Sequence, residues 1–262
     1  MRILFLGDIV GKPGRDLVQR RLPGLRRQWS PDFVVANGEN AAGGAGITGP
    51  VAEELFRAGI DCLTLGNHAW DRPQVAEYID GEPRLIRPLN WPPGTPGSGV
   101  VVLRGSAGRL GVINAQGRVF SPQLLDDPFR RVEQAVADLQ DKADAIFVDF
   151  HAEATSEKQA MGWFLDGRVS AVVGTHTHVP TADAVVLPGG TAYLTDVGMN
   201  GPWQSVIGMN KDRALERFLT QLPVRLEVAQ GPVILSAVLV EVREDGRAVA
   251  ITPIAERELG QP

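Results

Sequence analysis

Cysteine is nearly absent from this chain, since Cys62 is the single one among 262 residues. One cysteine cannot form a disulfide within the chain, which excludes a disulfide-stapled secreted scaffold and favours a reducing cytoplasm. Long apolar runs are lacking too, because no stretch approaches the roughly 18 apolar residues that a membrane-spanning helix needs. Residues 1–6 are mostly apolar but reach Gly7-Asp8 too soon for a signal peptide. The sequence therefore predicts a cytoplasmic protein with no membrane partner.

An excess of positive charge is also missing, with 26 Lys and Arg against 31 Asp and Glu and a formal net charge of −5. A protein that coats nucleic acid carries a basic footprint, so no long nucleic acid is expected as a partner. A single nucleotide in a metal-lined cleft stays compatible with this charge. The composition is that of a globular protein, with 44% hydrophobic and 22% charged residues. Without repeats or linkers, residues 1–262 are predicted to form one domain, and a homo-oligomer is compatible with the sequence.

Short apolar runs alternate with helical patterns along much of the chain. Buried strands are predicted at 3–6, 33–36, 62–65, 145–148 and 171–173, and hairpins at 100–103 with 110–114, 184–187 with 192–194, and 233–242 with 248–251. A first helix is predicted at 16–22, after a turn at 11–15 and before Pro23, and a second near 51–58. A third begins after an N-cap at Asp127 and carries Phe129, Val132, Val136 and Leu139 on one face. A fourth begins at Glu157, where Ser156 and Gln159 have the spacing of a capping box. This alternation predicts an α/β fold with largely buried strands.

Histidine is scarce as well, with four in the chain, and all four lie at the ends of predicted strands. A lone histidine beside a strand is more often a hydrogen-bonded core or surface residue than a ligand. Their shared placement favours one site, because ligands of open α/β sheets bind outside the carboxyl ends of the strands. The polar residues that follow five predicted strands are Asp8, Glu39 with Asn40, Asn67 with His68, His151, and His176 with His178.

The residue types at these strand ends fit one chemistry. Carboxylate, amide oxygen and imidazole together suit Mn, Fe, Zn or Co, and the lack of a thiolate cluster argues against a closed structural zinc site. Seven candidate ligands exceed what one tetrahedral ion needs, so two divalent ions are predicted. A carboxylate between two ions holds them roughly 3.5–4 Å apart, the separation used in two-metal phosphoester hydrolysis. Such ions bind phosphate oxygens and supply a bridging hydroxide that attacks phosphorus.

Several stretches are long enough to be specific. They are GDIVGKPGR (7–15), ANGENAAGG (36–44), LGNHAWD (65–71), DFHAEATSEK (149–158), GTHTH (174–178) and TDVGMNGP (195–202). These stretches resemble the YmdB-like bacterial subfamily of the calcineurin-like metallophosphoesterases. The resemblance covers nearly the whole chain. It implies a four-layer α/β/β/α sandwich with the site at the C-terminal ends of the strands, a di-metal centre, and 2′,3′-cyclic nucleotides as small phosphodiester substrates.

The resemblance also implies which residues bind the two metals. One metal would be held by Asp8, Glu39, Asn40 and His178, and the other by Glu39, Asn67, His151 and His176, so that Glu39 bridges them. The wider superfamily usually has a histidine two residues after the aspartate, where this chain has Val10. An oxygen of Asn40 would take the place of that imidazole nitrogen, which gives the first metal a harder set of ligands in the hard–soft sense. That change favours iron or manganese, with zinc, cobalt or magnesium as alternatives.

His68 directly follows a predicted ligand. The resemblance implies that it protonates the leaving oxygen, a role that suits imidazole because it titrates near neutrality. The alternative is that His68 orients a ligand or a bound water. Asp71 would orient His68, or equally would cap a helix that starts at Pro73.

The sequence thus predicts a di-metal phosphodiesterase for small cyclic nucleotides. Two alternatives stay open at this point: a phosphomonoesterase or nuclease on the same centre, and a regulatory nucleotide-binding protein with little turnover. His68 favours catalysis, because a protein that only binds has no need of an acid. The glycine-rich stretch 43–46 is no P-loop, since no Lys-Ser/Thr follows it, and serves either substrate approach or a tight loop. Residues 198–208 line either a pocket or a subunit contact.

Overall fold

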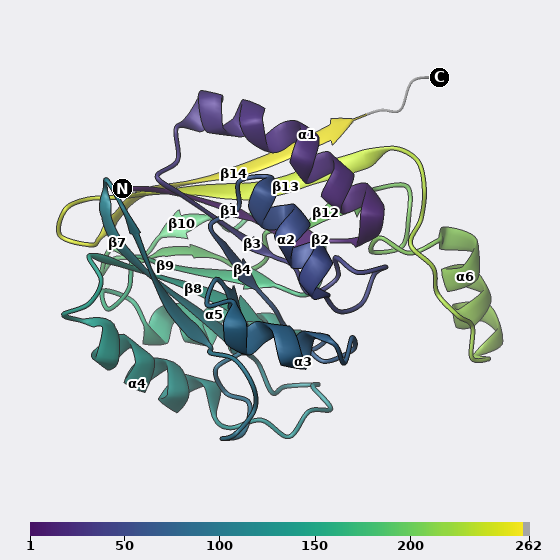
Figure 1. The fold of residues 1–262 in the computed structure, drawn as a ribbon, viewed down its shortest axis with the longest axis horizontal. Coiled ribbons are helices and arrows are strands. Elements are labelled where there is room, and N and C mark those ends of the chain that lie inside the picture. Colours follow the sequence, from purple (N-terminus) through teal and green to yellow (C-terminus); the bar gives the residue numbers. More distant parts are fainter. Residues whose placement is uncertain (259–262) are drawn as a thin grey trace.

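The computed structural model describes residues 1–258, which form two β-sheets with helices against the outer face of each (Figure 1). The elements in chain order are β1 (Arg2–Leu6), β2 (Asp8–Ile9), α1 (Gly11–Trp29), β3 (Phe33–Asn37), α2 (Gly49–Arg57), β4 (Cys62–Thr64), α3 (Val75–Tyr78), the 3-10 turn η1 (Ile79–Gly81), β5 (Leu85–Ile86), β6 (Val100–Gly105), β7 (Gly108–Gln116), α4 (Pro128–Leu139), β8 (Ala145–His151), α5 (Thr155–Phe164), β9 (Ala171–Thr175), β10 (Val185–Val186), β11 (Ala192–Leu194), β12 (Met199–Pro202), α6 (Lys211–Thr220), β13 (Val233–Val242) and β14 (Ala248–Glu258).

The two sheets are mixed, and each contains a run of parallel strands, which reaches one edge of the first sheet and lies in the middle of the second. The first sheet has the order β2-β12-β13-β1-β3-β4-β5, and β14 pairs with β13. Its strands β1, β3, β4 and β5 are parallel, with Phe5 opposite Val35. The second sheet has the order β10-β11-β9-β8-β7-β6, in which β7, β8, β9 and β11 are parallel. The three predicted hairpins are confirmed as β6–β7, β10–β11 and β13–β14.

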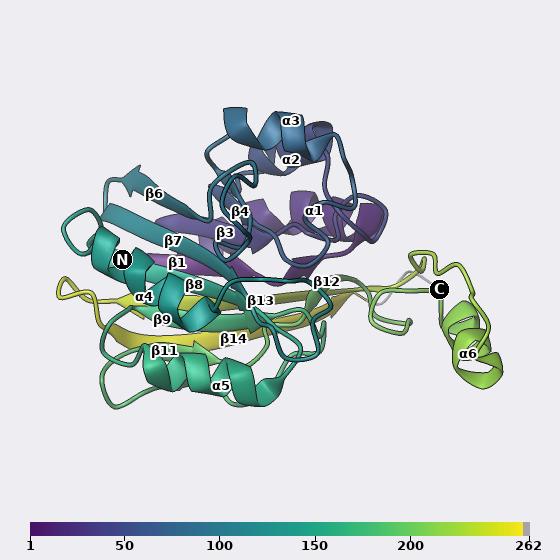
Figure 2. The same ribbon diagram turned by 90° about the horizontal axis from the view of Figure 1, so that it is seen from below.

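Three hydrophobic cores separate four layers, which gives the α/β/β/α order (Figure 2). Successive residues of β1 show why its whole run is apolar: Leu4 and Leu6 pack in the core under α1 and α2, whereas Ile3 and Phe5 pack between the sheets. Side chains of a strand alternate between its two faces, so a strand covered on both faces is apolar throughout. The third core packs α4 and α5 on the second sheet.

The predicted end of the first helix at Pro23 is wrong, because α1 runs from Gly11 to Trp29 with Pro23 inside it. The predicted turn at 11–15 forms the first turns of this helix. A proline costs a helix one hydrogen bond, but the buried side chains of Leu22 and Leu25 continue the apolar face past it. Tertiary packing therefore outweighs the local stop signal.

The two predicted helix starts in the second half differ in outcome. The N-cap at Asp127 is confirmed, since its carboxylate accepts hydrogen bonds from the backbone N–H groups of Phe129 and Arg130. The capping box at Ser156 is wrong, because α5 begins at Thr155 after Ala154 and has no side-chain cap. The Glu157 side chain instead accepts hydrogen bonds from the backbone of residues 118 and 119, so it ties a loop to the helix.

Among residues 1–258, no helix combines the length and the apolar character needed to cross a membrane. Helix α6 projects away from the sandwich in both views (Figures 1 and 2). The single domain over residues 1–262 stays a prediction, and its last four residues lie outside the described part of the chain.

Candidate metal centre

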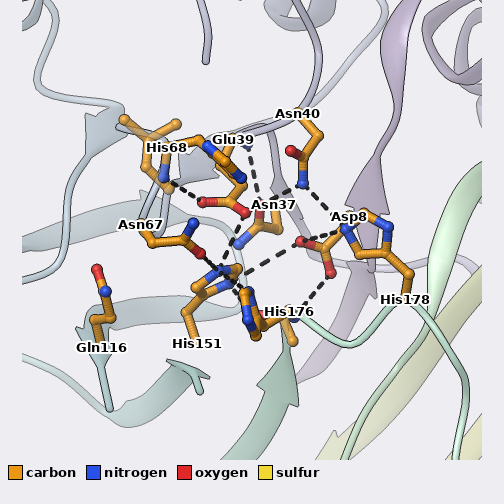
Figure 3. Close-up of polar contacts among 12 residues, drawn as sticks. Asp8, Asn37, Glu39, Asn40, Asn67, His68, Gln116, His151, His176 and His178 are labelled. Atoms are coloured by element: carbon orange, nitrogen blue, oxygen red, sulfur yellow. Dashed lines mark hydrogen bonds and ion pairs between the residues drawn. The ribbon is translucent and has the colours of Figure 1, made fainter. Parts of the chain in front are cut away.

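Carboxyl ends of strands from both sheets meet at one place, and all eight predicted site residues lie there (Figure 3). From the first sheet come Asp8 after β1, Glu39 and Asn40 after β3, and Asn67 and His68 after β4; from the second come His151 at the end of β8 and His176 and His178 after β9. The ends of five strands thus bring these side chains together.

Four of the predicted ligands converge on one point. The Nε2 atom of His151 lies 3.1 Å from Glu39 Oε1, 2.9 Å from Asn67 Oδ1 and 3.0 Å from His176 Nδ1. The ligating atoms of Glu39, His151 and His176 lie within 4.8 Å of one another. Oxygen and nitrogen lone pairs aimed at one point fit a divalent cation.

Asp8, Asn40 and His178 lie beside this group, on the other side of Glu39. Asp8 is fully buried, its Oδ1 has no hydrogen-bond partner, and His178 Nε2 lies 3.7 Å from that oxygen. The Asn40 amide lies 3.1 Å from both Glu39 Oε1 and His178 Nε2, and turning this amide would present its oxygen instead. A buried carboxylate oxygen without a partner is costly, so these residues fit a second cation.

The pKa values of the clustered groups are spread widely. Burial raises the pKa of Asp8 to about 6, although positive charge on His178 and His151 opposes the rise. Burial would also raise the pKa of Glu39, but the charge and hydrogen bond of His151 lower it to about 2. Glu39 in turn outweighs the burial of His151 and raises its pKa to about 9. Burial, together with His151, lowers the pKa of His176 to about 3. A cation at His151 Nε2 therefore competes with a proton.

A buried network sets the orientation of His151. Its Nδ1–H donates to Thr175 Oγ1 over 2.9 Å, and the Thr175 hydroxyl donates to Asp149 Oδ1 over 2.7 Å. Asp149 Oδ2 also accepts from Thr64 Oγ1 at 2.5 Å and Asn37 Nδ2 at 3.1 Å, which lie on the first sheet. Asp149 therefore joins the two sheets and leaves the Nε2 lone pair of His151 facing the cluster.

The other two histidines predicted as ligands, His176 and His178, are also oriented by hydrogen-bond partners. The Nδ1–H of His178 donates to Ile207 O at 2.9 Å, so the Nε2 lone pair faces Asn40 and Asp8. Glu153 Oε2 lies 2.9 Å from His176 Nε2, so the Nδ1 of His176 faces the cluster. Residues 198–208, left open by the sequence, thus contribute a backbone acceptor behind the site.

The turn that carries His176 and His178 is strained, with φ values of +100° and +65° at these two residues. Asp196 stabilises this turn, since its Oδ2 accepts from Thr177 N at 3.1 Å and from Thr177 Oγ1 at 2.8 Å. Lys158 Nζ lies 2.7 Å from the same oxygen, and both charged side chains are buried.

His68 lies at the exposed edge of the cluster. Its backbone N–H donates to Glu39 Oε2 at 3.0 Å, and its Nδ1 lies 2.7 Å from Asp71 Oδ2. Asp71 therefore contacts His68 rather than capping a helix. The helix start at Pro73 is wrong, because α3 begins at Val75 and has no side-chain cap. The glycine-rich stretch 43–46 lies in a turn that Arg72 supports, since this side chain donates hydrogen bonds to the carbonyls of Ala45 and of the neighbouring Ala42.

Reasoning from the sequence missed the supporting residues Asp149, Thr175, Lys158 and Asp196. Asp196 follows the apolar strand β11 just as Asp8 follows β1, so the strand-end pattern could have found it. Thr175 and Lys158 carry no such signal, because a threonine in a strand and a lysine in a helix are most often ordinary surface residues.

Glycine directly precedes the predicted ligand at three of these strand ends, and Gly66 is the one whose backbone lies against other predicted ligands. A Cβ at Gly66 would overlap the His151 ring and the Glu39 carboxylate. We expect Gly66→Ala to lower the affinity for Mn²⁺ roughly tenfold or more, because both groups must move apart. Isothermal titration of the metal-free protein measures this. Gly81→Ala, where a Cβ meets nothing within 4 Å, is the control. Equal affinities in the two variants would contradict the crowding.

The fold and this cluster together define the class: a four-layer sandwich of the metallophosphoesterase type. The sequence model of the family described as YmdB-like protein matches residues 4–254, and the chain belongs to this family. This membership confirms the resemblance stated from the motifs, and with it the class of enzyme, a phosphoesterase.

Three relatives illustrate the family. A Bacillus subtilis protein named 2′,3′-cyclic-nucleotide 2′-phosphodiesterase is 51% identical over 242 residues, which cover 92% of this chain and 91% of the relative. A hypothetical protein from Thermus thermophilus has a crystal structure with a TM-score of 0.92 at 47% identity, covering 98% of this chain and all (100%) of that one. A structure described as a novel phosphatase from Mycoplasma pneumoniae has a TM-score of 0.92 at 34% identity, covering 99% and 94%.

Proposed function

We propose that this protein is a di-metal phosphodiesterase that hydrolyses 2′,3′-cyclic nucleotides. The observation that carries the proposal is the convergence of carboxylate, amide and imidazole groups from two sheets on one partly open site. The activity for which the Bacillus subtilis relative is named supports the choice of substrate. The Asp71–His68 pair beside the cluster favours turnover over binding alone.

The proposed ligands of one metal are Asp8, Glu39, Asn40 and His178, and those of the other are Glu39, Asn67, His151 and His176. When bound, two divalent ions, iron or manganese by preference, would neutralise phosphate oxygens and make a water molecule more acidic. The chain's own contribution is to fix the ligand orientations through Asp149, Glu153 and the Ile207 carbonyl. Elemental analysis of the purified protein identifies the metals.

His68 is the proposed proton donor. Asp71 holds the Nδ1–H of His68, so Nε2 carries the proton that is delivered. A water molecule loses one proton to solvent as its oxygen adds to phosphorus, the bond from phosphorus to the ribose 2′ oxygen breaks, and that oxygen takes the proton from His68 Nε2. His68 regains a proton from solvent before the next turnover. The product is a nucleoside 3′-phosphate.

We expect His68→Ala to lower kcat for 2′,3′-cyclic AMP by roughly 10²- to 10⁴-fold. The loss for bis-p-nitrophenyl phosphate should be much smaller, because p-nitrophenolate is a weak base that leaves without a proton. Both rates are measured with manganese or iron, alongside the metal content of each protein.

The two substrates separate the alternatives for His68 and for the activity. Equal losses on both substrates would assign His68 an orienting role instead of proton donation. Wild type that binds metal yet hydrolyses neither diester refutes the proposed function. Faster hydrolysis of p-nitrophenyl phosphate than of either diester would support the phosphomonoesterase alternative.

A further inference from the structure

A small pocket continues from the candidate metal centre toward the loop that follows β7. Its volume is about 90 Å³. Asn67, His151 and His176 line one side, and Gly117 with residues 120–123 of the loop line the other. A ligand whose phosphate lies at the metal centre would therefore place its next group against this loop.

Phe120 is the unusual residue of this loop. Its side chain is 84% exposed, more than that of Phe218 on the projecting helix α6 at 69%. Its φ of +61° lies in the left-handed region, which a bulky residue rarely adopts. Strain and exposure in one aromatic residue beside a reaction site cost stability, so they point to a role in binding.

The loop is held firmly against the site by hydrogen bonds. The backbone N–H of Gly117 donates to His151 O at 2.9 Å. The N–H groups of Arg118 and Val119 donate to the Glu157 carboxylate at 2.9 and 3.1 Å. Phe120 is thus presented by a preorganised loop, which lowers the entropy lost when a ligand binds.

Gln116 adds a polar group to the same pocket wall (Figure 3). Its side chain is only 2% exposed. The Nε2 donates to Ser121 Oγ and Gln123 Oε1, both at 3.2 Å, whereas Oε1 has no partner. A buried acceptor without a donor is costly, and an N–H group of a ligand would satisfy it.

We propose that this pocket is the nucleobase subsite: the base stacks on Phe120 and donates an N–H to Gln116 Oε1. The inference rests on the proposed function, because the phosphate must lie at the metal centre for the base to reach Phe120. An aromatic face stacks on any base, so the subsite accepts several bases. The Gln116 oxygen favours bases with an amino group.

The test compares two substrates that differ only in the base. They are 2′,3′-cyclic AMP and methyl β-D-ribofuranoside 2′,3′-cyclic phosphate, in which a methoxy group replaces adenine. We expect Phe120→Ala to raise KM for 2′,3′-cyclic AMP roughly tenfold and to leave kcat within about twofold. The KM for the base-free substrate should not change. Phe120→Trp should keep the wild-type KM, and Phe218→Ala, the control for an exposed phenylalanine, should change neither value.

Other results overturn the subsite. An unchanged KM for 2′,3′-cyclic AMP in Phe120→Ala, or an equal rise for both substrates, shows that Phe120 does not contact the base. If Phe120→Ala has wild-type kinetics but a smaller particle mass in solution than the wild-type protein, Phe120 belongs to a contact between copies of the chain instead. If the wild-type protein hydrolyses neither substrate, both the proposed function and the subsite are refuted. If the wild-type protein is active and Phe120→Ala has the wild-type KM for 2′,3′-cyclic AMP, the subsite alone is refuted.

Discussion

Glu39→Gln is expected to lower kcat/KM for 2′,3′-cyclic AMP by roughly 10³-fold or more. Glu39 is a fully buried carboxylate with Oε1 3.1 Å from His151 Nε2 and also 3.1 Å from the Asn40 amide. Glutamine keeps the shape and removes the negative charge that both proposed cations share. Steady-state kinetics and the metal content of the same preparation provide the measurement.

Glu77→Gln, on the exposed side of α3, is the matched control and should retain wild-type values. A Glu39→Gln protein with full metal content and activity within tenfold of wild type would rule out the bridging role. Full metal content with low activity would limit Glu39 to a role in the reaction itself.

Lys158→Met is expected to lower the free energy of unfolding by about 3–5 kcal/mol. Lys158 is only 1% exposed, and its Nζ lies 2.7 Å from the fully buried Asp196 carboxylate. Methionine has a similar volume, so the main loss is that Asp196 is left as a buried charge without its cation. Urea unfolding of the metal-free proteins measures this change without a contribution from bound ions.

The double variant Lys158→Met with Asp196→Asn should regain part of the stability, because it removes the uncompensated charge. Lys12→Met is the control, since Lys12 forms an exposed pair with Asp16 at 2.6 Å and should change stability by less than about 1 kcal/mol. Similar changes in Lys158→Met and Lys12→Met would refute the stabilising role of the buried pair. Because Asp196 also holds Thr177, weaker metal binding should accompany the loss of stability.

The α/β class and the strand-end positions of the candidate ligands could be predicted from the residues for one physical reason, whereas the four-layer order was implied by the family resemblance. Strands covered on both faces are apolar throughout, so a polar residue directly after such a run is conspicuous. Asp8 and His151 stand out in this way. The fit to a metal then follows from residue type. Neither step requires knowledge of how the two sheets pack.

Other features depend on packing between segments that are distant in the sequence. Pro23 lies inside a helix because the apolar side chains before and after it, Leu22 and Leu25, are buried against the first sheet. Asp149 connects Thr64 on one sheet with Thr175 on the other, a relation that no local pattern encodes. The strained backbone at His176 and the exposed ring of Phe120 likewise become visible only in three dimensions.

The position of β13 has a consequence for how the protein is made. This strand lies between β12 and β1, so the first sheet stays divided until the C-terminal hairpin has been synthesised and inserted. Every candidate ligand, from Asp8 to His178, leaves the ribosome before that strand does. Since β1 pairs with residues more than two hundred positions away, folding should be slow. A nascent chain thus carries all its candidate ligands before the scaffold that aligns them is complete, and productive metal loading should follow the insertion of β13.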